Sequence, residues 1–290
     1  MKEIYGSGVA LITCFNNDLS VDYNSMNKLL SHVISGGVDY LVLLGTTGES
    51  VTLSKKEKSE IVTFIRKKYT EIPIIVGIGG NNTNNIIEEI KETDFEGIDA
   101  ILSISPYYNK PSQEGIYNHY KMISKVSPIP IILYNVPSRT GSNISSYTTL
   151  RLANDFENIV AIKEASGNLD QIMNIINHKP DNFTVLSGDD SLTLPMIYMG
   201  AKGVISVIGQ LFPNEYTKMV HEALNNNIDE ANSIHYNLYH FYEPLYNEGN
   251  PVGIKAALNA IDICNLQVRP PLIHASKKII DQFNSLLLNK

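Results

Sequence analysis

Residues 131–163 read IILYNVPSRTGSNISSYTTLRLANDFENIVAIK, and this stretch contains the repeating unit of the fold. Two short apolar runs, at 131–134 and 159–162, flank an amphipathic segment at 146–154 that follows the capping residue Ser145. Apolar runs without strict alternation of apolar and polar residues indicate strands covered on both faces, as in parallel sheets. The stretch therefore predicts a strand, a helix and a second, parallel strand.

The same pattern recurs along most of the chain. Eight apolar runs predict strands, at 9–12, 40–44, 74–76, 100–102, 131–134, 159–162, 184–186 and 204–206. Amphipathic segments predict helices, at 23–35, 55–68, 83–93, 113–125, 146–154, 169–177, 192–199 and 214–225. Capping residues precede several of them, namely Asp22, Ser54, Ser112, Ser145 and Asn168. Successive runs start about 28 residues apart, as in βα units, so we predict an α/β fold in which eight units close a (β/α)8 TIM barrel.

The last 65 residues or so have a different pattern. No strand-like run follows residue 225, and three helical patterns occur at 230–246, 252–260 and 275–288. We therefore predict two parts, a barrel at 1–225 and a C-terminal helical region at 226–290. A doubly wound open sheet is the structural alternative, although it usually has fewer strands and an obvious phosphate-binding motif.

The composition is that of a globular protein and argues against several kinds of partner. The chain has 290 residues, 43% of them hydrophobic, and a formal net charge of −7. Its basic residues are scattered, which argues against nucleic acid and against an anionic membrane surface as partners. No apolar run approaches the roughly 20 residues that span a bilayer, and the start lacks the apolar core of a signal peptide, so we expect a cytoplasmic protein. Cys14 and Cys264 are expected to be buried thiols.

Lys163 directly follows the apolar run 159–162, at the position where barrels of this class carry their active site. A lysine there points into the barrel mouth or into the layer between sheet and helices, and both places are poor in water. Such a site disfavours the ammonium form and leaves an amine able to attack a carbonyl carbon. The alternative is a structural lysine whose charge is held at the strand end by Glu164 or a carbonyl group.

Other polar residues follow neighbouring strands. Tyr134 ends the preceding run, where its phenol is a candidate proton carrier or, as a structural residue, a cap on the barrel core. Thr46 and Thr47 lie between two glycines, where hydroxyl and N–H groups can hold a small carboxylate, although Gly-Thr-Thr-Gly is also an ordinary turn. Arg139 follows a proline-containing turn and suits bidentate capture of a carboxylate, although an isolated surface arginine would mean little.

Metal and nucleotide chemistry find little support in the sequence. The seven histidines fall in helical or helix-end segments, away from the strand ends, so we predict no metal site. The glycine-rich run at 77–80 lacks the spacing of a phosphate-binding motif. Tyr107 and Tyr108 form an aromatic pair on a loop, which more often indicates an interface or a lid than catalysis.

Five motifs carry a resemblance to a known family, at 45–49, 106–115, 134–141, 162–168 and 187–190. In content and order they resemble those of the 4-hydroxy-tetrahydrodipicolinate synthases, formerly dihydrodipicolinate synthases, within the N-acetylneuraminate lyase superfamily. The resemblance runs from about Gly8 to the C-terminal helices. It implies a Schiff-base enzyme that condenses pyruvate with L-aspartate 4-semialdehyde, the first committed step of the diaminopimelate and lysine pathway, without a metal, nucleotide or organic cofactor.

The resemblance also implies roles for individual residues. Lys163 matches the Schiff-base lysine, and Tyr134, Thr46 and Tyr108 match a proton relay in which the last tyrosine crosses from the neighbouring subunit of a tight dimer. The substrate-binding positions match Thr47 for the pyruvate carboxylate, Arg139 for the semialdehyde carboxylate, and Gly188 and Ile205 in the lining of the pocket. The assembly implied is a homotetramer built from two such dimers.

Two alternative functions remain open. A sugar-acid lyase, such as N-acetylneuraminate or 2-keto-3-deoxygluconate aldolase, would use the same lysine, and a non-catalytic metabolite-binding barrel would have lost the reaction. The resemblance further implies an allosteric cleft for L-lysine at the dimer interface, here lined by Ser50, Lys55, Lys58, Asn81, Asn85 and Tyr107. Family members that respond to L-lysine commonly carry two histidines and a glutamate where this chain has Lys55, Lys58 and Asn85. Two cations there would repel the ammonium group of L-lysine, so we predict weak or absent inhibition.

Overall fold

The structure is a computed structural model and describes residues 4–290. Within these residues, eight parallel strands close a barrel in chain order, β1 to β8, with helices between the strands. The predicted fold class is therefore confirmed. The chain forms two compact units, one built mainly of Pro73–Ile205 and one of Gly6–Ile72 with Ser206–Lys290.

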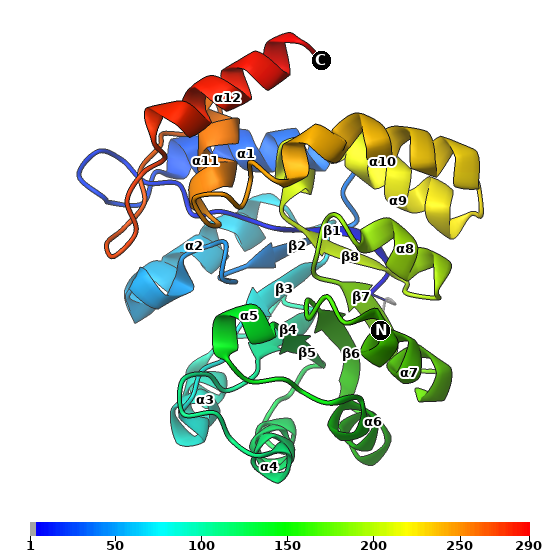
Figure 1. Ribbon diagram of the computed structural model, residues 1–290. Helices are drawn as coiled ribbons and strands as arrows, with labels where there is room; N and C mark the ends of the chain where they lie inside the picture. Colours follow the sequence, from blue (N-terminus) through cyan, green and yellow to red (C-terminus); the bar gives the residue numbers. More distant parts are fainter. Residues whose placement is uncertain (1–3) are drawn as a thin grey trace. The chain divides into compact units, whose positions relative to one another are not determined.

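The first unit contains strands β3 to β8 and the helices between them. Its strands are β3 (Ile74–Gly77), β4 (Ala100–Ile104), β5 (Ile131–Asn135), β6 (Ile159–Glu164), β7 (Thr184–Ser187) and β8 (Gly203–Ser206). Its helices are α3 (Thr83–Glu92), α4 (Gln113–Ser124), α5 (Pro137–Thr140), α6 (Ser146–Asp155), α7 (Leu169–His178) and α8 (Thr193–Tyr198). Helices α3, α4, α6 and α7 lie side by side along the outer side of the sheet (Figure 1). The strands are almost wholly buried, as expected for a sheet with two apolar faces.

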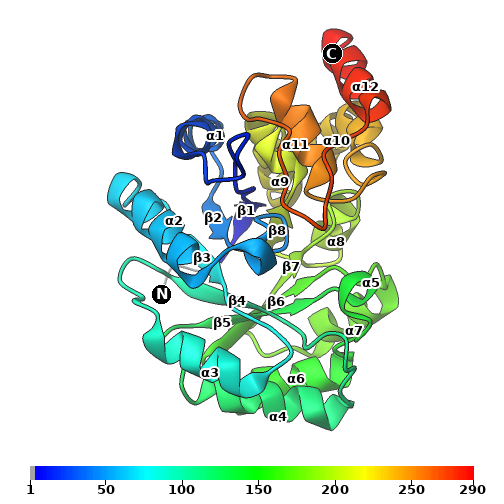
Figure 2. The ribbon, with the colours of Figure 1, turned by 90° about the vertical axis from the view of Figure 1, so that its left-hand side faces the viewer.

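The second unit combines the two ends of the chain. It begins with β1 (Gly6–Ala10), α1 (Tyr23–Ser35), β2 (Tyr40–Leu43), the 3-10 turn η1 (Ser50–Thr52) and α2 (Lys55–Lys68). It continues after β8 with the turn η2 (Ile208–Gln210) and helices α9 (Pro213–Leu224), α10 (Ile228–Tyr242), α11 (Val252–Asn259) and α12 (Lys277–Leu288). Helix α9 packs on α1 and β1, α10 packs on α9, and α12 packs on α11 (Figure 2). Among residues 4–290, no helix combines the length and apolar character needed to cross a bilayer.

The helix starts agree closely with the sequence. The side chains of Asp22, Ser54, Ser112, Ser145 and Asn168 each accept a hydrogen bond from a backbone N–H in the first turn of the following helix, so all five predicted caps are confirmed. Strand β1 covers residues 6–10, whereas the apolar run predicted 9–12. The Leu11 N–H still donates to the carbonyl of Val42 at 3.0 Å, but that of Ile12 donates to the Gln210 side chain at 2.8 Å, so strand pairing ends here while both side chains stay buried.

Candidate active site

Strands β5 and β6 hold Tyr134 and Lys163 opposite one another. Strand β6 contains one extra residue, Val160, between its first and second paired positions, so the register shifts by one. The shift places Lys163, and not Ile162, opposite Tyr134. Paired residues of neighbouring strands point to the same face of a sheet, and the phenol and the amine therefore share one face.

Both side chains are buried and lie in contact. The relative exposure is 5% for Lys163 and 7% for Tyr134, and Lys163 Nζ lies 4.4 Å from the centre of the Tyr134 ring. The next residue, Glu164, points to the opposite face, where α7 covers the sheet. The Glu164 side chain therefore does not hold Lys163, and the structural interpretation of this lysine keeps only a carbonyl group as its partner.

Gly188, which follows β7, forms the wall beside the aliphatic stem of Lys163. A Cβ atom built on Gly188 would lie 2.9 Å from Lys163 Cε and 2.8 Å from Ala165 Cβ. Both distances are shorter than normal carbon contacts, because optimal separation is about 3.5–4.0 Å. A glycine is therefore needed at this position for the lysine to keep its present rotamer.

We expect Gly188→Ala to lower kcat/KM for pyruvate roughly 10- to 100-fold, because a displacement of a reacting atom by about 1 Å can cost two orders of magnitude. Steady-state kinetics and the rate of borohydride trapping with pyruvate measure the effect. Gly115→Ala is the matched control, since its new methyl would meet only Pro111 and Ser112 at 3.1 and 3.5 Å. Equal losses in both variants would show that Gly188 does not act through Lys163.

A buried network on the helix-covered face ties the ends of β5 and β6 together. Glu164, 1% exposed, accepts hydrogen bonds from Asn135 Nδ2 at 2.5 Å, Ser166 Oγ at 3.2 Å and Gln171 Nε2 at 3.3 Å. Asn143 Nδ2 donates to Gln171 Oε1 at 2.8 Å, and Asn143 Oδ1 accepts from Asn135 Nδ2 at 2.8 Å. Burial raises the pKa of Glu164 to about 7, although the three donors act in the opposite direction.

The sequence alone did not reveal this network, although Asn135 and Glu164 each follow a candidate catalytic residue directly. That adjacency is the signal that could have found them. Tyr134 is paired with Lys163 across β5 and β6, so the next residue of each strand is paired as well, and Asn135 lies opposite Glu164. The network therefore fixes the backbone positions from which Tyr134 and Lys163 project.

The loops after β4 and β5 carry the aromatic pair and the arginine. Tyr108 has a left-handed backbone, with φ of 73°, and its side chain is 87% exposed, whereas Tyr107 is half-buried. The backbone N–H of Tyr108 donates to the carbonyl of Thr140 at 3.4 Å, which joins the two loops. Arg139 is exposed on α5, the short helix that begins two residues after β5 ends. Ile205 is buried in β8, at 1% exposure.

In the second unit, Thr46 and Thr47 form a tight turn after β2. Gly48 N donates to Gly45 O at 3.1 Å, and Glu49 N donates to Thr46 O at 3.1 Å. The side chain of Thr47 is 3% exposed and accepts a hydrogen bond from Asn250 Nδ2 at 2.9 Å, whereas Thr46 is half-buried. The turn has the backbone geometry expected of Gly-Thr-Thr-Gly, with the addition of this long-range contact.

The residues predicted for an allosteric cleft divide between the two units. Ser50, Lys55 and Lys58 lie in η1 and the first turn of α2. Asn81 and Asn85 lie exposed before and within the first turn of α3, in the same unit as Tyr107. Among the described residues, no group of three or more His, Cys, Asp or Glu side chains could hold a metal ion.

Comparison with known proteins places the chain in one family. The sequence profile of the dihydrodipicolinate synthetase family matches residues 3–290 of this chain. A 4-hydroxy-tetrahydrodipicolinate synthase of Azobacteroides pseudotrichonymphae is 52% identical over 291 residues, which cover 99% of this chain and 98% of the relative. The dihydrodipicolinate synthase structure from Aquifex aeolicus superposes on this chain with a TM-score of 0.95 at 40% identity. That from Acinetobacter baumannii, in complex with pyruvate, superposes with a TM-score of 0.95 at 36% identity. Each comparison covers 99% of this chain and 98% of the other. The chain therefore belongs to the dihydrodipicolinate synthetase family.

Proposed function

We propose that this enzyme condenses pyruvate with L-aspartate 4-semialdehyde to 4-hydroxy-tetrahydrodipicolinate through a Schiff base on Lys163. The observation that carries the proposal is the buried amine of Lys163, 4.4 Å from the Tyr134 ring and confined by Gly188. Family membership supports the same reaction, because the relatives compared above are named as synthases of this product.

The chemistry requires only an amine and a route for protons. The neutral amine attacks the keto carbon of pyruvate, and loss of water forms an imine that accepts electrons. The methyl group of the imine then loses a proton to form an enamine, whose carbon attacks the aldehyde and re-forms the imine. The amino group of the added semialdehyde attacks that imine carbon, which closes the ring and releases the amine of Lys163. We propose that Tyr134, whose ring lies 4.4 Å from Lys163 Nζ, exchanges protons with the nitrogen and its leaving water. The imine itself provides the electron sink, so we propose a reaction without a metal or organic cofactor.

Thr46 and Tyr108 complete the proposed proton relay. The resemblance assigns Tyr108 to a relay in the neighbouring subunit, and its 87% exposure on a left-handed loop suits a side chain that enters a partner. We therefore propose that the enzyme works as a tight dimer, two of which form a homotetramer. We also propose that it acts in the cytoplasm, where its two buried cysteines would remain free thiols.

The two substrate carboxylates have separate proposed partners. Thr47 holds the pyruvate carboxylate, with Gly188 and Ile205 lining the pocket, and the exposed guanidinium of Arg139 receives the semialdehyde carboxylate at the entrance. We expect Arg139→Ala to raise KM for the semialdehyde about 10- to 100-fold, the effect of losing a charge-assisted hydrogen-bond pair. The concentration of pyruvate that half-saturates borohydride trapping should stay unchanged. A parallel loss of pyruvate binding would contradict the assignment.

Substrate assays in parallel test the reaction itself. The enzyme should form product from pyruvate and L-aspartate 4-semialdehyde, and it should cleave N-acetylneuraminate and 2-keto-3-deoxygluconate far more slowly. Faster cleavage of a sugar acid would assign the chain to the lyases instead. A protein that gains no mass from pyruvate and borohydride would be the non-catalytic barrel, and the proposal would fail.

We expect L-lysine to inhibit weakly or not at all. Lys55 and Lys58 carry two positive charges in the first turn of α2, and Asn85 offers no carboxylate to an ammonium group. Initial rates at increasing L-lysine, with both substrates near their KM values, measure the effect. Half-maximal inhibition below about 1 mM, an affinity near 4 kcal/mol, would contradict the expectation.

A further inference from the structure

A buried ion pair anchors the turn that carries Thr46 and Thr47. Glu49, which follows the turn, pairs with Lys255 of the C-terminal helical region. We propose that Glu49 and Lys255 are positioning residues, which hold this turn in the conformation that receives the pyruvate carboxylate. The proposal rests on the function proposed above and extends it to residues that touch no substrate. Its evidence lies wholly within the second unit, where the turn and helices α9 to α12 fold together.

Glu49 closes the turn in a strained conformation. Its backbone is left-handed, with φ of 53°, a conformation that costs about 1–2 kcal/mol for a residue with a side chain. The side chain is buried at 3% exposure, and the carboxylate has partners on both oxygens. Lys255 Nζ donates to Oε1 at 2.5 Å, and the backbone N–H of Arg269 donates to Oε2 at 2.9 Å. These contacts hold Glu49 where its N–H closes the turn on Thr46 O.

Lys255 is fully buried in α11, at 0% exposure. Besides Glu49 it donates to the carbonyl of Gln267 at 2.7 Å, and its Nζ lies 4.4 Å from the centre of the Phe15 ring. Burial lowers the pKa of Lys255, while Glu49 acts in the opposite direction. A buried ion pair of this kind adds little net stability compared with apolar residues of similar volume. The role that remains for the pair is to select one conformation of the turn.

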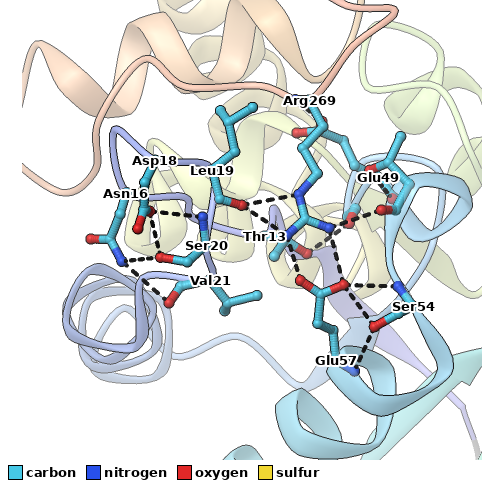
Figure 3. Close-up of polar contacts among 12 residues, drawn as sticks. Thr13, Asn16, Asp18, Leu19, Ser20, Val21, Glu49, Ser54, Glu57 and Arg269 are labelled. Carbon is cyan, nitrogen blue, oxygen red and sulfur yellow. Dashed lines mark hydrogen bonds and ion pairs between the residues drawn. The ribbon is translucent and has the colours of Figure 1, made fainter.

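Arg269 holds the far side of the same segment (Figure 3). Its guanidinium donates to the carbonyl of Thr52 at 2.8 Å and to that of Leu19 at 2.8 and 3.1 Å, and it forms a bidentate pair with Glu57. The hydrogen bond from Arg269 lowers the pKa of Glu57 to about 2, so the pair stays ionised near neutral pH. Residues 49–57 are thus fixed at three places by the segment that follows α11.

Asn250 orients the hydroxyl group of Thr47 directly. Asn250 Nδ2 donates to Thr47 Oγ1 at 2.9 Å, so one lone pair of this oxygen is occupied by a protein donor. A hydroxyl group has one hydrogen to donate, and the hydrogen of Thr47 can then point to a ligand. Together with the ion pair, this contact makes the C-terminal helical region part of the pyruvate-binding apparatus.

A double-mutant cycle tests the proposal. Lys255→Met leaves a buried, unpaired charge on Glu49, and Glu49→Gln leaves a buried, unpaired charge on Lys255. The double variant removes both charges and keeps similar side-chain volumes. We expect each folded variant, the double included, to raise KM for pyruvate about 10-fold or more, the size of one lost positioning contact. KM for the semialdehyde should change less than about twofold. The melting temperature should fall in the single variants and recover in the double, because no unpaired charge remains.

The control is an ion pair of the same unit away from the turn. Lys218 and Glu230 join α9 and α10 at 2.6 Å with both side chains about half exposed, and Lys218→Met should change neither KM. If the double variant recovers both its melting temperature and its KM for pyruvate, the pair is merely structural and the proposal fails. If wild-type protein forms no adduct with pyruvate, the proposed function fails instead, so the two failures are distinguishable. If the single variants do not fold, the double variant alone decides.

Discussion

Lys163→Ala is expected to abolish the mass increase that pyruvate and borohydride produce in the wild-type protein. Only a primary amine can form the imine that borohydride reduces, and Lys163 is the buried amine that lies against Tyr134. The condensation rate should fall at least about a thousandfold, as expected when the nucleophile of a covalent mechanism is removed. Mass spectrometry of the intact protein and steady-state rates measure both effects.

Two control variants separate the lost nucleophile from a lost contact. Lys163→Met keeps an aliphatic stem beside Gly188 and should be as inactive as Lys163→Ala. Lys202→Ala removes an exposed lysine of the same unit and should keep both adduct and rate. A mass increase that survives in Lys163→Ala would place the nucleophile at another lysine and overturn the proposed mechanism.

Glu164→Gln is expected to stabilise the protein in a manner that depends on pH. The ordinary pKa of a glutamate side chain is 4.5, and burial raises that of Glu164 to about 7. Below pH 4.5 both folded and unfolded chains are protonated here, and the group contributes nothing. Between pH 4.5 and about 7, Glu164 is ionised in the unfolded chain but still protonated in the folded one, so the free energy of unfolding of the wild type falls as pH rises. Above pH 7 the penalty is constant, at about 3 kcal/mol.

Glutamine resembles the protonated carboxyl group and avoids this penalty. The amide oxygen of the introduced glutamine can accept from Asn135 and Gln171, and its amide nitrogen can donate to the Ser166 hydroxyl group. At pH 8 the variant should melt about 5 °C or more above the wild type, and at pH 4.5 the two should melt together. Glu157→Gln, at the exposed position before β6, should show no such change with pH. A difference that is equal at both pH values would refute the raised pKa.

The sequence predicts well those features that depend on neighbouring residues. The five predicted caps each act on the next turn of chain, within three residues, so Ser54 or Asn168 can be recognised without any tertiary structure. The strand runs are recognisable because both faces are buried, which leaves little polar character in β4 and β5 and confines that of β6 to its last two residues. Lys163 and Tyr134 stand out in the sequence because barrels carry their chemistry at strand ends.

The features that the sequence did not predict depend on residues far apart in the chain. The pair of Glu49 and Lys255 joins positions 206 residues apart, and neither residue stands in a pattern that names its partner. Glu164, beside the lysine proposed as nucleophile, is also not recognisable as buried until Gln171 and Asn135 are placed around it. The register of β6 is a further case, because periodicity does not reveal an extra residue within an apolar run.

The extra residue in β6 also determines which changes of length this segment can absorb. Ile159 is paired before Val160 and residues 161–164 after it, so the two parts of the strand are aligned separately. Deleting Val160 would leave an ordinary parallel ladder with the amine still beside the phenol. Deleting Ile162 would instead turn the amine outward, toward the amides of Asn135 and Gln171, and present the carboxylate of Glu164 to the interior. The direction in which Lys163 points is thus unaffected by loss of the extra residue before Ala161, but it is reversed by loss of a residue after Ala161.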